Sequence, residues 1–312
     1  MSRPWKPALL LGALLAALVV WLAALQPWDP DTWWHLRTGQ LILETRSVPR
    51  ADPYSFVLNG GPWVTFEWLS EVIFYGFWRM SPAWGLEALK TLLALAAALG
   101  FWLVGGASAW TFGLLSLGLL THHGFLSDRP QLFDYALLPV FLLLCKSDRP
   151  TRRHWLALPA CAALWANLHG GAAILGAGVV AAKTAAAWLL PACAARRKQD
   201  AAAWAALALA CAAAIFVNPH GLRLLSHTSG TLLFRHREII GEWKTFQDPL
   251  SWDGLFLAGG AAAAALAWRR QPLLALCATA LGVLSLSAVR HLFLYMLTAS
   301  ALIGLALEER FP

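Results

Sequence analysis

The sequence predicts an all-α polytopic membrane protein, a single bundle over residues 1–312 with about ten spanning helices and two further helices at the membrane surface. Three observations predict this fold class. Apolar residues make up 59% of the 312 residues, charged residues make up only 13%, and the mean hydropathy is +0.57. A soluble domain usually carries about 25% charged residues, so an ordinary cytosolic enzyme and a disordered protein are both excluded.

Two further classes are disfavoured by the placement of cysteines and basic residues. The cysteines are scattered with no short spacing, which argues against a secreted domain built on disulfides; they are Cys145, Cys161, Cys193, Cys211 and Cys277. The formal net charge is +7, but the basic residues fall mostly between apolar runs, where membrane topology explains them. We therefore expect no nucleic-acid partner.

The spans follow from the lengths of the apolar runs. A spanning helix needs roughly 17–25 apolar residues, because the hydrocarbon is about 30 Å thick and a helix rises about 1.5 Å per residue. The first run, 7–26, has no cleavage-site pattern and is interpreted as a retained anchor. The stretch 155–192 is broken at Asn167–Gly171 and predicts two spans, or a re-entrant hairpin that would reduce the total to eight. The other expected spans are 85–105, 108–121, 132–145, 202–217, 253–268, 272–288 and 292–307.

Clusters of basic residues orient these spans. Such clusters favour the cytoplasmic side, and they occur at Arg3/Lys6, 146–153, 196–198 and 269–270. An even number of spans between successive clusters places both termini in the cytoplasm of a multi-pass protein of the bacterial inner membrane. Under this topology His154 is the one cytoplasmic histidine, and most acidic residues lie outside. Two long extracytoplasmic loops are expected, at 27–84 and 218–252.

The first of these loops contains the most informative local patterns. Asp31 or Thr32 can cap a helix running to about Arg46, and an extended segment with two prolines follows at 48–55. A second amphipathic helix is expected over Thr65–Met80. Both helices mix aromatic, apolar and charged residues, which suits the water–lipid interface.

The segment Asp31-Thr-Trp-Trp-His-Leu-Arg37 directly follows the first span and precedes the two interfacial helices. This arrangement resembles the GT-C superfamily of integral membrane glycosyltransferases, and the local pattern is similar to the first loop of oligosaccharyltransferase catalytic subunits. The longer pattern through 52–56 and 67–69 looks like that of uncharacterised bacterial membrane proteins grouped with this superfamily. The chain departs from the family in carrying Asp29-Pro-Asp31 where many members have a paired Asp-Glu.

The resemblance implies a function. Such an enzyme transfers a sugar from a polyprenyl-phosphate-linked carrier to an envelope acceptor at the extracytoplasmic face, and the family places an essential carboxylate in the first loop. Many members also carry a soluble C-terminal domain, whereas this chain ends just after its last expected span. Membrane lipids, the sugar-carrying lipid, an unidentified acceptor and an envelope-assembly partner protein are therefore the expected partners.

The chemistry of transfer selects candidate residues. Asp31 is the preferred base for the acceptor hydroxyl, with Asp29 as its alternate, and Glu67 would stabilise an oxocarbenium-like transition state. Arg129 and Arg290 are expected to bind the leaving phosphate, because a guanidinium contacts two phosphate oxygens at once. The remaining substrate-binding candidates share the outer face: His35, Arg37, Asn167, His169, Asn218, His220 and His291.

Structural roles compete with these assignments. Asp31 can serve as a helix cap, Arg129 and Arg290 as interfacial anchors, and the Asn/His pairs as partners for backbone groups at span ends. Imidazole and carboxylate together suit a divalent cation such as Mg²⁺ or Mn²⁺. No spacing matches a recognised metal motif, however, so the sequence assigns no metal ligand and no certain cofactor.

Two rival functions remain open at this point: a transporter or flippase of a lipid-linked or anionic substrate, and a non-catalytic subunit of an envelope-assembly complex. A transporter should carry charges in the middle of its spans, and here Lys183 and Asp134 lie toward span ends. If the site is one-sided, we expect one cavity at the outer face to be lined by Asp31, Glu67, Arg129, His169 and Arg290.

Overall fold

The computed structural model describes residues 5–25, 29–57, 59–189, 194–232, 234 and 239–311. The last residue of the first expected span (26) and parts of the two predicted outer loops (27–28, 58, 233 and 235–238) therefore lie outside the described residues. The same is true of Arg3 and of the side chains of Lys6 and of the basic cluster 196–198. Helices make up the regular structure of the described ranges, apart from one isolated bridge between Ala51 and Pro62. The predicted all-α class is confirmed.

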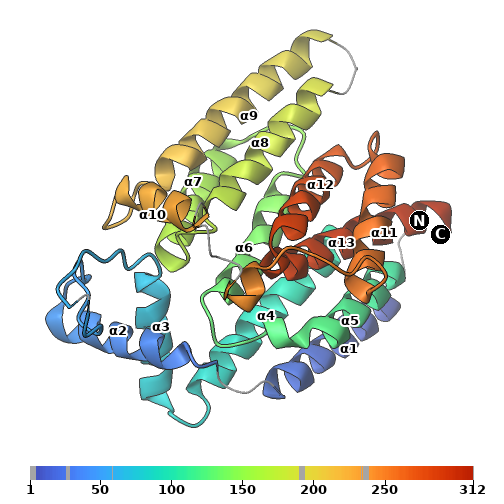
Figure 1. Cartoon of the computed structure of the whole chain (residues 1–312). Helices are drawn as coiled ribbons and strands as arrows, with labels where there is room; N and C mark the ends of the chain where they lie inside the picture. Colours follow the sequence, from blue (N-terminus) through green and yellow to red (C-terminus); the bar gives the residue numbers. More distant parts are fainter. Residues whose placement is uncertain are drawn as a thin grey trace.

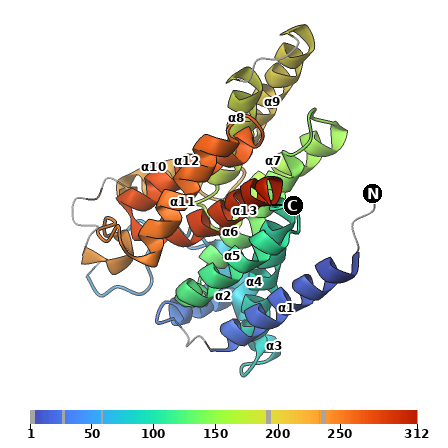
Figure 2. The ribbon, with the colours of Figure 1, turned by 90° about the vertical axis from the view of Figure 1, so that its right-hand side faces the viewer.

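Thirteen α-helices lie in the described residues (Figures 1 and 2). They are α1 (Trp5–Ala24), α2 (Thr32–Thr45), α3 (Trp68–Met80), α4 (Gly85–Val104), α5 (Ala109–His122), α6 (Gln131–Leu144), α7 (Arg152–Leu168), α8 (Ile174–Leu189), α9 (Ala194–Ala214), α10 (Arg223–Leu232), α11 (Trp252–Ala267), α12 (Pro272–Ser287) and α13 (Leu292–Arg310). Each of the ten expected spans corresponds to one helix. The break predicted at Asn167–Gly171 falls between α7 and α8.

The lengths of these helices correct the expected number of spans. Within the described residues, three helical segments are long and apolar enough to cross a membrane: Pro7–Ala24, Gly85–Val104 and Val289–Arg310. The other apolar helices have 10–17 residues, and a 14-residue helix such as α5 reaches only about 21 Å at helical rise. The expected ten full spans are therefore not found, because turns at Ser108, Pro130 and Gly170 divide the apolar sequence into shorter helices.

The core is built around α13. Most of its side chains are buried, from Leu292 through Leu302, and α13 packs against α5, α11, α12 and α4. A helix that is apolar on all sides belongs inside a bundle rather than on its surface. A second, smaller apolar cluster includes Leu36, Phe74 and Phe133 and joins α2 and α3 to α6.

The two predicted interfacial helices form a platform at one end of the bundle, at the lower left of Figure 1. α2 agrees with the prediction closely, and α3 begins three residues later than expected. The platform is fastened to the end of α7, because Ser70 Oγ donates to Leu168 O (2.8 Å) and Trp68 Nε1 donates to Asn167 Oδ1 (2.7 Å). These contacts hold Glu67 beside the loop that follows α7.

Candidate functional site

A cavity of about 360 Å³ lies where the starts of α2, α3 and α6 meet the ends of α7 and α12. The five side chains predicted to share one cavity, Asp31, Glu67, Arg129, His169 and Arg290, all line it. The rest of the lining contains an apolar portion that includes Ala172, Ile174, Leu175, Leu284 and Leu294. The cavity therefore offers both a charged surface and an apolar surface to one ligand.

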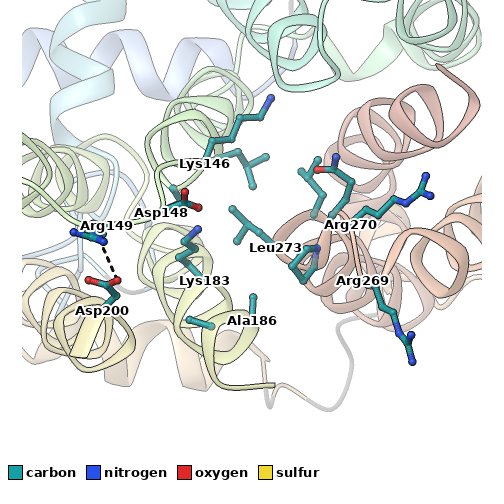
Figure 3. Close-up of a pocket in the computed structure, with 15 residues that line it drawn as sticks. Lys146, Asp148, Arg149, Lys183, Ala186, Asp200, Arg269, Arg270 and Leu273 are labelled. Atoms are coloured by element: carbon teal, nitrogen blue, oxygen red, sulfur yellow. Dashed lines mark ion pairs between the residues drawn. The ribbon is translucent and has the colours of Figure 1, made fainter. Parts of the chain in front are cut away.

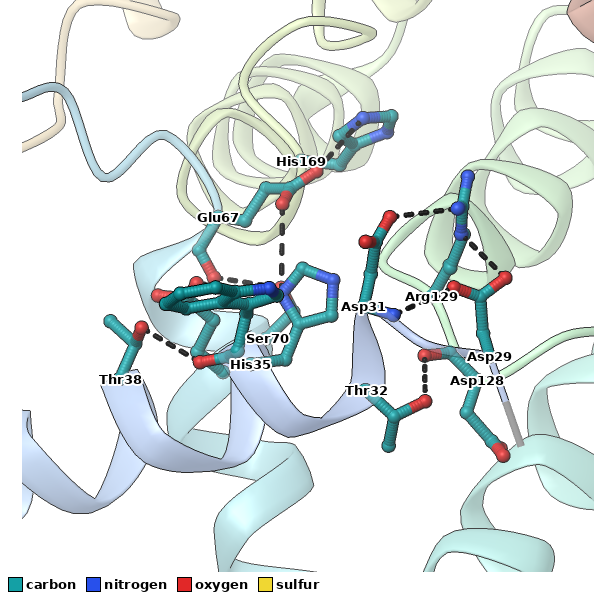
Figure 4. A network of polar contacts seen from close by, with 12 residues as sticks. Asp29, Asp31, Thr32, His35, Thr38, Glu67, Ser70, Asp128, Arg129 and His169 are labelled. Atoms are coloured by element: carbon teal, nitrogen blue, oxygen red, sulfur yellow. Dashed lines mark hydrogen bonds and ion pairs between the residues drawn. The ribbon is translucent and has the colours of Figure 1, made fainter. Parts of the chain in front are cut away.

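Arg129 is the centre of the charged portion (Figure 4). Its three guanidinium nitrogens contact three carboxylates: Nε lies 2.8 Å from Asp29 Oδ2, Nη2 lies 2.7 Å from Asp31 Oδ2, and Nη1 lies 3.0 Å from Glu242 Oε2. Figure 4 shows the contacts with Asp29 and Asp31. Asp31 occupies the N-cap position of α2, but its side chain makes no capping hydrogen bond. Its carboxylate instead reaches Arg129, so capping does not account for this residue.

Arg290 joins the same cluster from the other side of Glu242. Arg290 Nη1 lies 3.3 Å from Glu242 Oε1, and the guanidinium carbon lies 4.4 Å from the centre of the Trp243 ring. The stacking orients a planar group that would otherwise be flexible. Glu242 thus bridges the two arginines, and neither arginine is merely an interfacial anchor.

A buried chain of proton-exchanging groups lies next to the cluster. His169 Nδ1 lies 2.6 Å from Asp134 Oδ2, and its Nε2 lies 3.3 Å from Glu67 Oε1. The second oxygen of Asp134 accepts a hydrogen bond of 2.6 Å from Trp165 Nε1. Both oxygens of Asp134 are therefore occupied, which fixes the orientation of the His169 ring and leaves Nε2 facing Glu67.

Burial and neighbouring charges perturb the pKa values of this chain in a consistent way. Burial raises the pKa of Glu67, although His169 and His35 act against that effect. Burial opposes the charged form of His169, but Asp134 and Glu67 outweigh it and raise the pKa of His169 above its usual value. Glu67 and His169 are therefore a neighbouring carboxyl and imidazole that both hold their protons more tightly than usual.

A third group of ligand atoms lies on the platform. One imidazole nitrogen of His35 and carboxylate oxygens of Glu67 and Glu71 lie within 4.8 Å of one another. Of the sequence-predicted residues, His35 and His291 also line the main cavity, whereas Asp29 lines an adjoining cavity of about 390 Å³ that shares Arg129 and Arg290.

Four predicted binding residues do not line the main cavity. The side chain of Arg37 is 53% exposed and lies 3.9 Å from Glu44. Asn167 Nδ2 donates to Ala163 O and Val217 O (both 2.7 Å). Asn218 Oδ1 accepts from the backbone N–H groups of His220 and Gly221. Both asparagines therefore hydrogen-bond backbone groups at helix ends, which is the structural role that the sequence left open for them. The backbone of His220 takes part in the hydrogen bonds of Asn218.

No protein-family model, no curated protein and no solved structure matches the chain. The resemblance to membrane glycosyltransferases thus rests on the first-loop pattern.

Three residues of the site were not predicted from the sequence: Glu242, Asp134 and Glu71. Asp134 had a usable signal, because an ionisable residue inside an apolar run is a functional candidate by default. Glu71 lies four residues after Glu67 and hence on the same helical face. Glu242 had no local signal, because its role depends on a contact with Arg129 that spans 113 positions of the chain.

A larger cavity, of about 570 Å³, lies at the other end of the same helices (Figure 3). Its lining is rich in basic side chains and includes Lys146, Arg149, Lys183, Arg269 and Arg270. Three helices connect the two cavities. α6 begins just after Arg129 and ends at the basic cavity, whereas α7 and α12 begin near the basic cavity and end just before His169 and Arg290, respectively. The acidic, histidine-rich cluster and the basic cluster therefore occupy opposite ends of the bundle.

Removing the charge of Asp134 is expected to lower stability. Asp134→Asn keeps an acceptor for Trp165 but deprives His169 of its charged partner, and losing a hydrogen bond to a buried charged group costs about 1–3 kcal/mol. Thermal unfolding of the detergent-solubilised protein, followed by tryptophan emission, measures the loss. The exposed Asp148→Asn on the α6–α7 turn is the matched control and should change stability by less than about 0.5 kcal/mol; equal stabilities of the two variants would contradict the role of Asp134.

Proposed function

We propose that the protein is a membrane glycosyltransferase that takes a sugar from a polyprenyl-phosphate carrier and passes it to an envelope acceptor. The observation that carries this proposal is the lining of the main cavity, where Asp31, Arg129 and Arg290 adjoin an apolar portion that includes Leu175 and Leu284. A prenyl chain suits the apolar portion, and a sugar phosphate suits the charged portion. The first-loop resemblance supports the same substrate class.

The proposed reaction is a displacement at C1 of the sugar. Asp31, whose side chain is 51% exposed, accepts the proton of the acceptor hydroxyl as the new bond from oxygen to C1 forms. The bond between C1 and the phosphate oxygen breaks, and the carrier phosphate leaves with that electron pair. A positioned base contributes roughly 10²–10⁴-fold to such a step.

The two arginines stabilise the negative charge that develops on the leaving phosphate. A guanidinium has five N–H donors; three nitrogens of Arg129 are engaged by carboxylates, whereas one nitrogen of Arg290 contacts Glu242. Within the described residues, Arg290 thus has further donors for phosphate oxygens, and Arg129 holds Asp31 in place while adding positive charge. Fixed donors stabilise charge that develops in a transition state without the cost of reorientation.

The separation of charge along the bundle supports a location at the extracytoplasmic face of the bacterial plasma membrane. Basic side chains gather at one end and the proposed site lies at the other. At the basic end, Lys146 Nζ donates to Val104 O (2.6 Å) at the end of α4, and Arg270 pairs with Glu309 near the end of α13. Cytoplasmic surfaces of membrane proteins are enriched in such cations, so both termini are placed in the cytoplasm under this proposal.

Transfer of label from a defined carrier tests the proposal. The purified protein is incubated in nanodiscs with radiolabelled polyprenyl-phosphate glucose or mannose and an envelope extract that supplies acceptors. We expect acceptor-bound label with the wild type and a rate lowered by about 10²–10⁴-fold in Asp31→Asn. The rate should be unchanged in Cys161→Ser, because Cys161 does not line the cavity.

The same assay separates the rival functions. A flippase would move the labelled lipid across the bilayer without breaking the C1–phosphate bond, and a non-catalytic subunit would bind the lipid or nothing without turnover. Either outcome, or full activity in Asp31→Asn, would contradict the proposed transferase and its base.

A further inference from the structure

The ligand cluster on the platform has a geometry of its own. His35 projects from α2, Glu67 immediately precedes α3, and Glu71 lies one turn into α3 (Figure 4 shows His35 and Glu67). His35 Nδ1 lies 3.4 Å from Glu71 Oε1 and 3.8 Å from Glu67 Oε2. Three ligand atoms from two crossing helices thus converge on one point.

In the described part of the chain, no lysine or arginine pairs with these buried carboxylates. Glu71 is only 5% exposed, and its Oε2 has no hydrogen-bond partner among the described residues. The ion-pairing partners of Glu67 and Glu71 in the described part of the chain are histidines, His35 and His169, and not lysine or arginine. A buried carboxylate is costly unless it is protonated, paired or bound to a metal ion.

The spacing of the ligand atoms fits a small cation. Nitrogen and oxygen ligands lie about 2.0–2.2 Å from a tetrahedral zinc ion, which places neighbouring ligands about 3.3–3.6 Å apart. The two distances from His35 Nδ1 are close to this range. A cavity of about 160 Å³ adjoins the cluster and is lined by all three ligands together with Thr38 and Thr65, which leaves room for a water ligand.

Two helices in close contact carry the cluster, and two nearby carboxylates are paired with Arg129. At the crossing of α2 and α3 the backbone of Gly39 lies against the carbonyl of Glu71, so the ligands are carried by helices in direct contact. Asp29 and Asp31, the other acidic residues of the first loop near the cavity, pair with Arg129. Within the described residues, the carboxylates of the platform instead face histidine side chains, which leaves them without a lysine or arginine partner.

We propose that His35 Nδ1, Glu67 and Glu71 bind a divalent transition-metal ion, zinc by preference, with a fourth position open to water. One imidazole and two carboxylates suit zinc better than Mg²⁺, which prefers oxygen ligands and retains several waters. This site is separate from the Asp31–Arg129–Arg290 cluster, and its existence does not depend on the proposed sugar transfer. Because Glu67 also faces His169, the ion would connect the platform to the main cavity.

Direct metal analysis tests the proposal. The purified protein is stripped with a chelator, dialysed against zinc, and analysed by inductively coupled plasma mass spectrometry and by a competition titration for affinity. We expect one zinc ion per chain in the wild type. In Glu71→Gln the affinity should fall by more than the roughly 10–100-fold that loss of an outer-shell partner costs.

Glu44→Gln is the matched control. Glu44 is exposed on α2, where its carboxylate accepts a hydrogen bond from Gln40, so this variant should bind zinc as the wild type does. Glu71→Gln has the same shape as the buried acid and should fold without metal, and its unfolding temperature should no longer rise on addition of zinc. Wild-type protein that binds no zinc, binding of Mg²⁺ in preference to zinc, or undiminished affinity in Glu71→Gln would each overturn the proposal.

Discussion

Replacing Arg129 with alanine is expected to lower the rate of sugar transfer by about 100- to 1,000-fold, the usual cost of removing one preorganised donor from a charge-stabilising site. The structural reason is that Arg129 contacts Asp29, Asp31 and Glu242 at 2.7–3.0 Å. Without the guanidinium, the proposed base Asp31 loses its position and three carboxylates are left to repel one another. The labelled-carrier assay measures the rate.

The variant Arg129→Lys distinguishes the contribution of the positive charge at residue 129 from that of the planar guanidinium. A lysine keeps the positive charge but presents a single ammonium in place of a planar fork with several donors, so it cannot hold all three carboxylates at once. We expect its rate to lie between those of wild type and Arg129→Ala, with an unfolding temperature closer to that of the wild type. The exposed Arg79→Ala at the end of α3 should change neither quantity.

A different result would be informative about the site. If Arg129→Lys were as active as the wild type, the three-way contact would not matter for the reaction and Arg290 alone would serve the phosphate. If Arg129→Ala were folded and fully active, the proposed transfer site would be wrong.

Gly39→Val is expected to destabilise the platform by about 3 kcal/mol, the upper part of the range for overpacking. A Cβ atom at Gly39 would clash with the backbone carbonyl of Glu71 and come within 2.9 Å of Tyr75 Cβ. Because a backbone carbonyl cannot rotate away as a side chain can, α2 and α3 would have to separate. Thermal unfolding in detergent measures the loss, and zinc affinity should fall with it because His35 and Glu71 would move apart.

Gly76→Ala provides the matched control on α3, since a Cβ at that glycine meets no atom within 4 Å. Alanine in the middle of a helix is favoured over glycine by roughly 0.5–1 kcal/mol, so this variant should be as stable as the wild type or slightly more stable. Equal stability of Gly39→Val and Gly76→Ala would show that the two helices do not pack as closely as the structure has them.

Local sequence determined a large part of the molecule. Apolar runs and turn residues were sufficient for the all-α class, for the break after Leu168 and for the two platform helices, because helix formation depends on residues within a few turns. The distribution of basic and acidic residues was also sufficient to predict that Asp31, Arg129 and Arg290 share one cavity. The predicted topology puts all loops of one membrane face at the same end of the bundle, so residues in these loops are expected to lie near one another.

Tertiary structure alone decided which of those neighbours meet. The bridge from Glu242 to both arginines, the pairing of Asp134 with His169 and the convergence of His35 with Glu71 join residues 35 to 113 positions apart in the chain, and they depend on where helices cross. The same holds for Asn167 and Asn218, which face backbone groups instead of the cavity. A hydrophobic or charge pattern predicts which face of a single helix is buried. Which side chains contact each other depends instead on how several helices pack together.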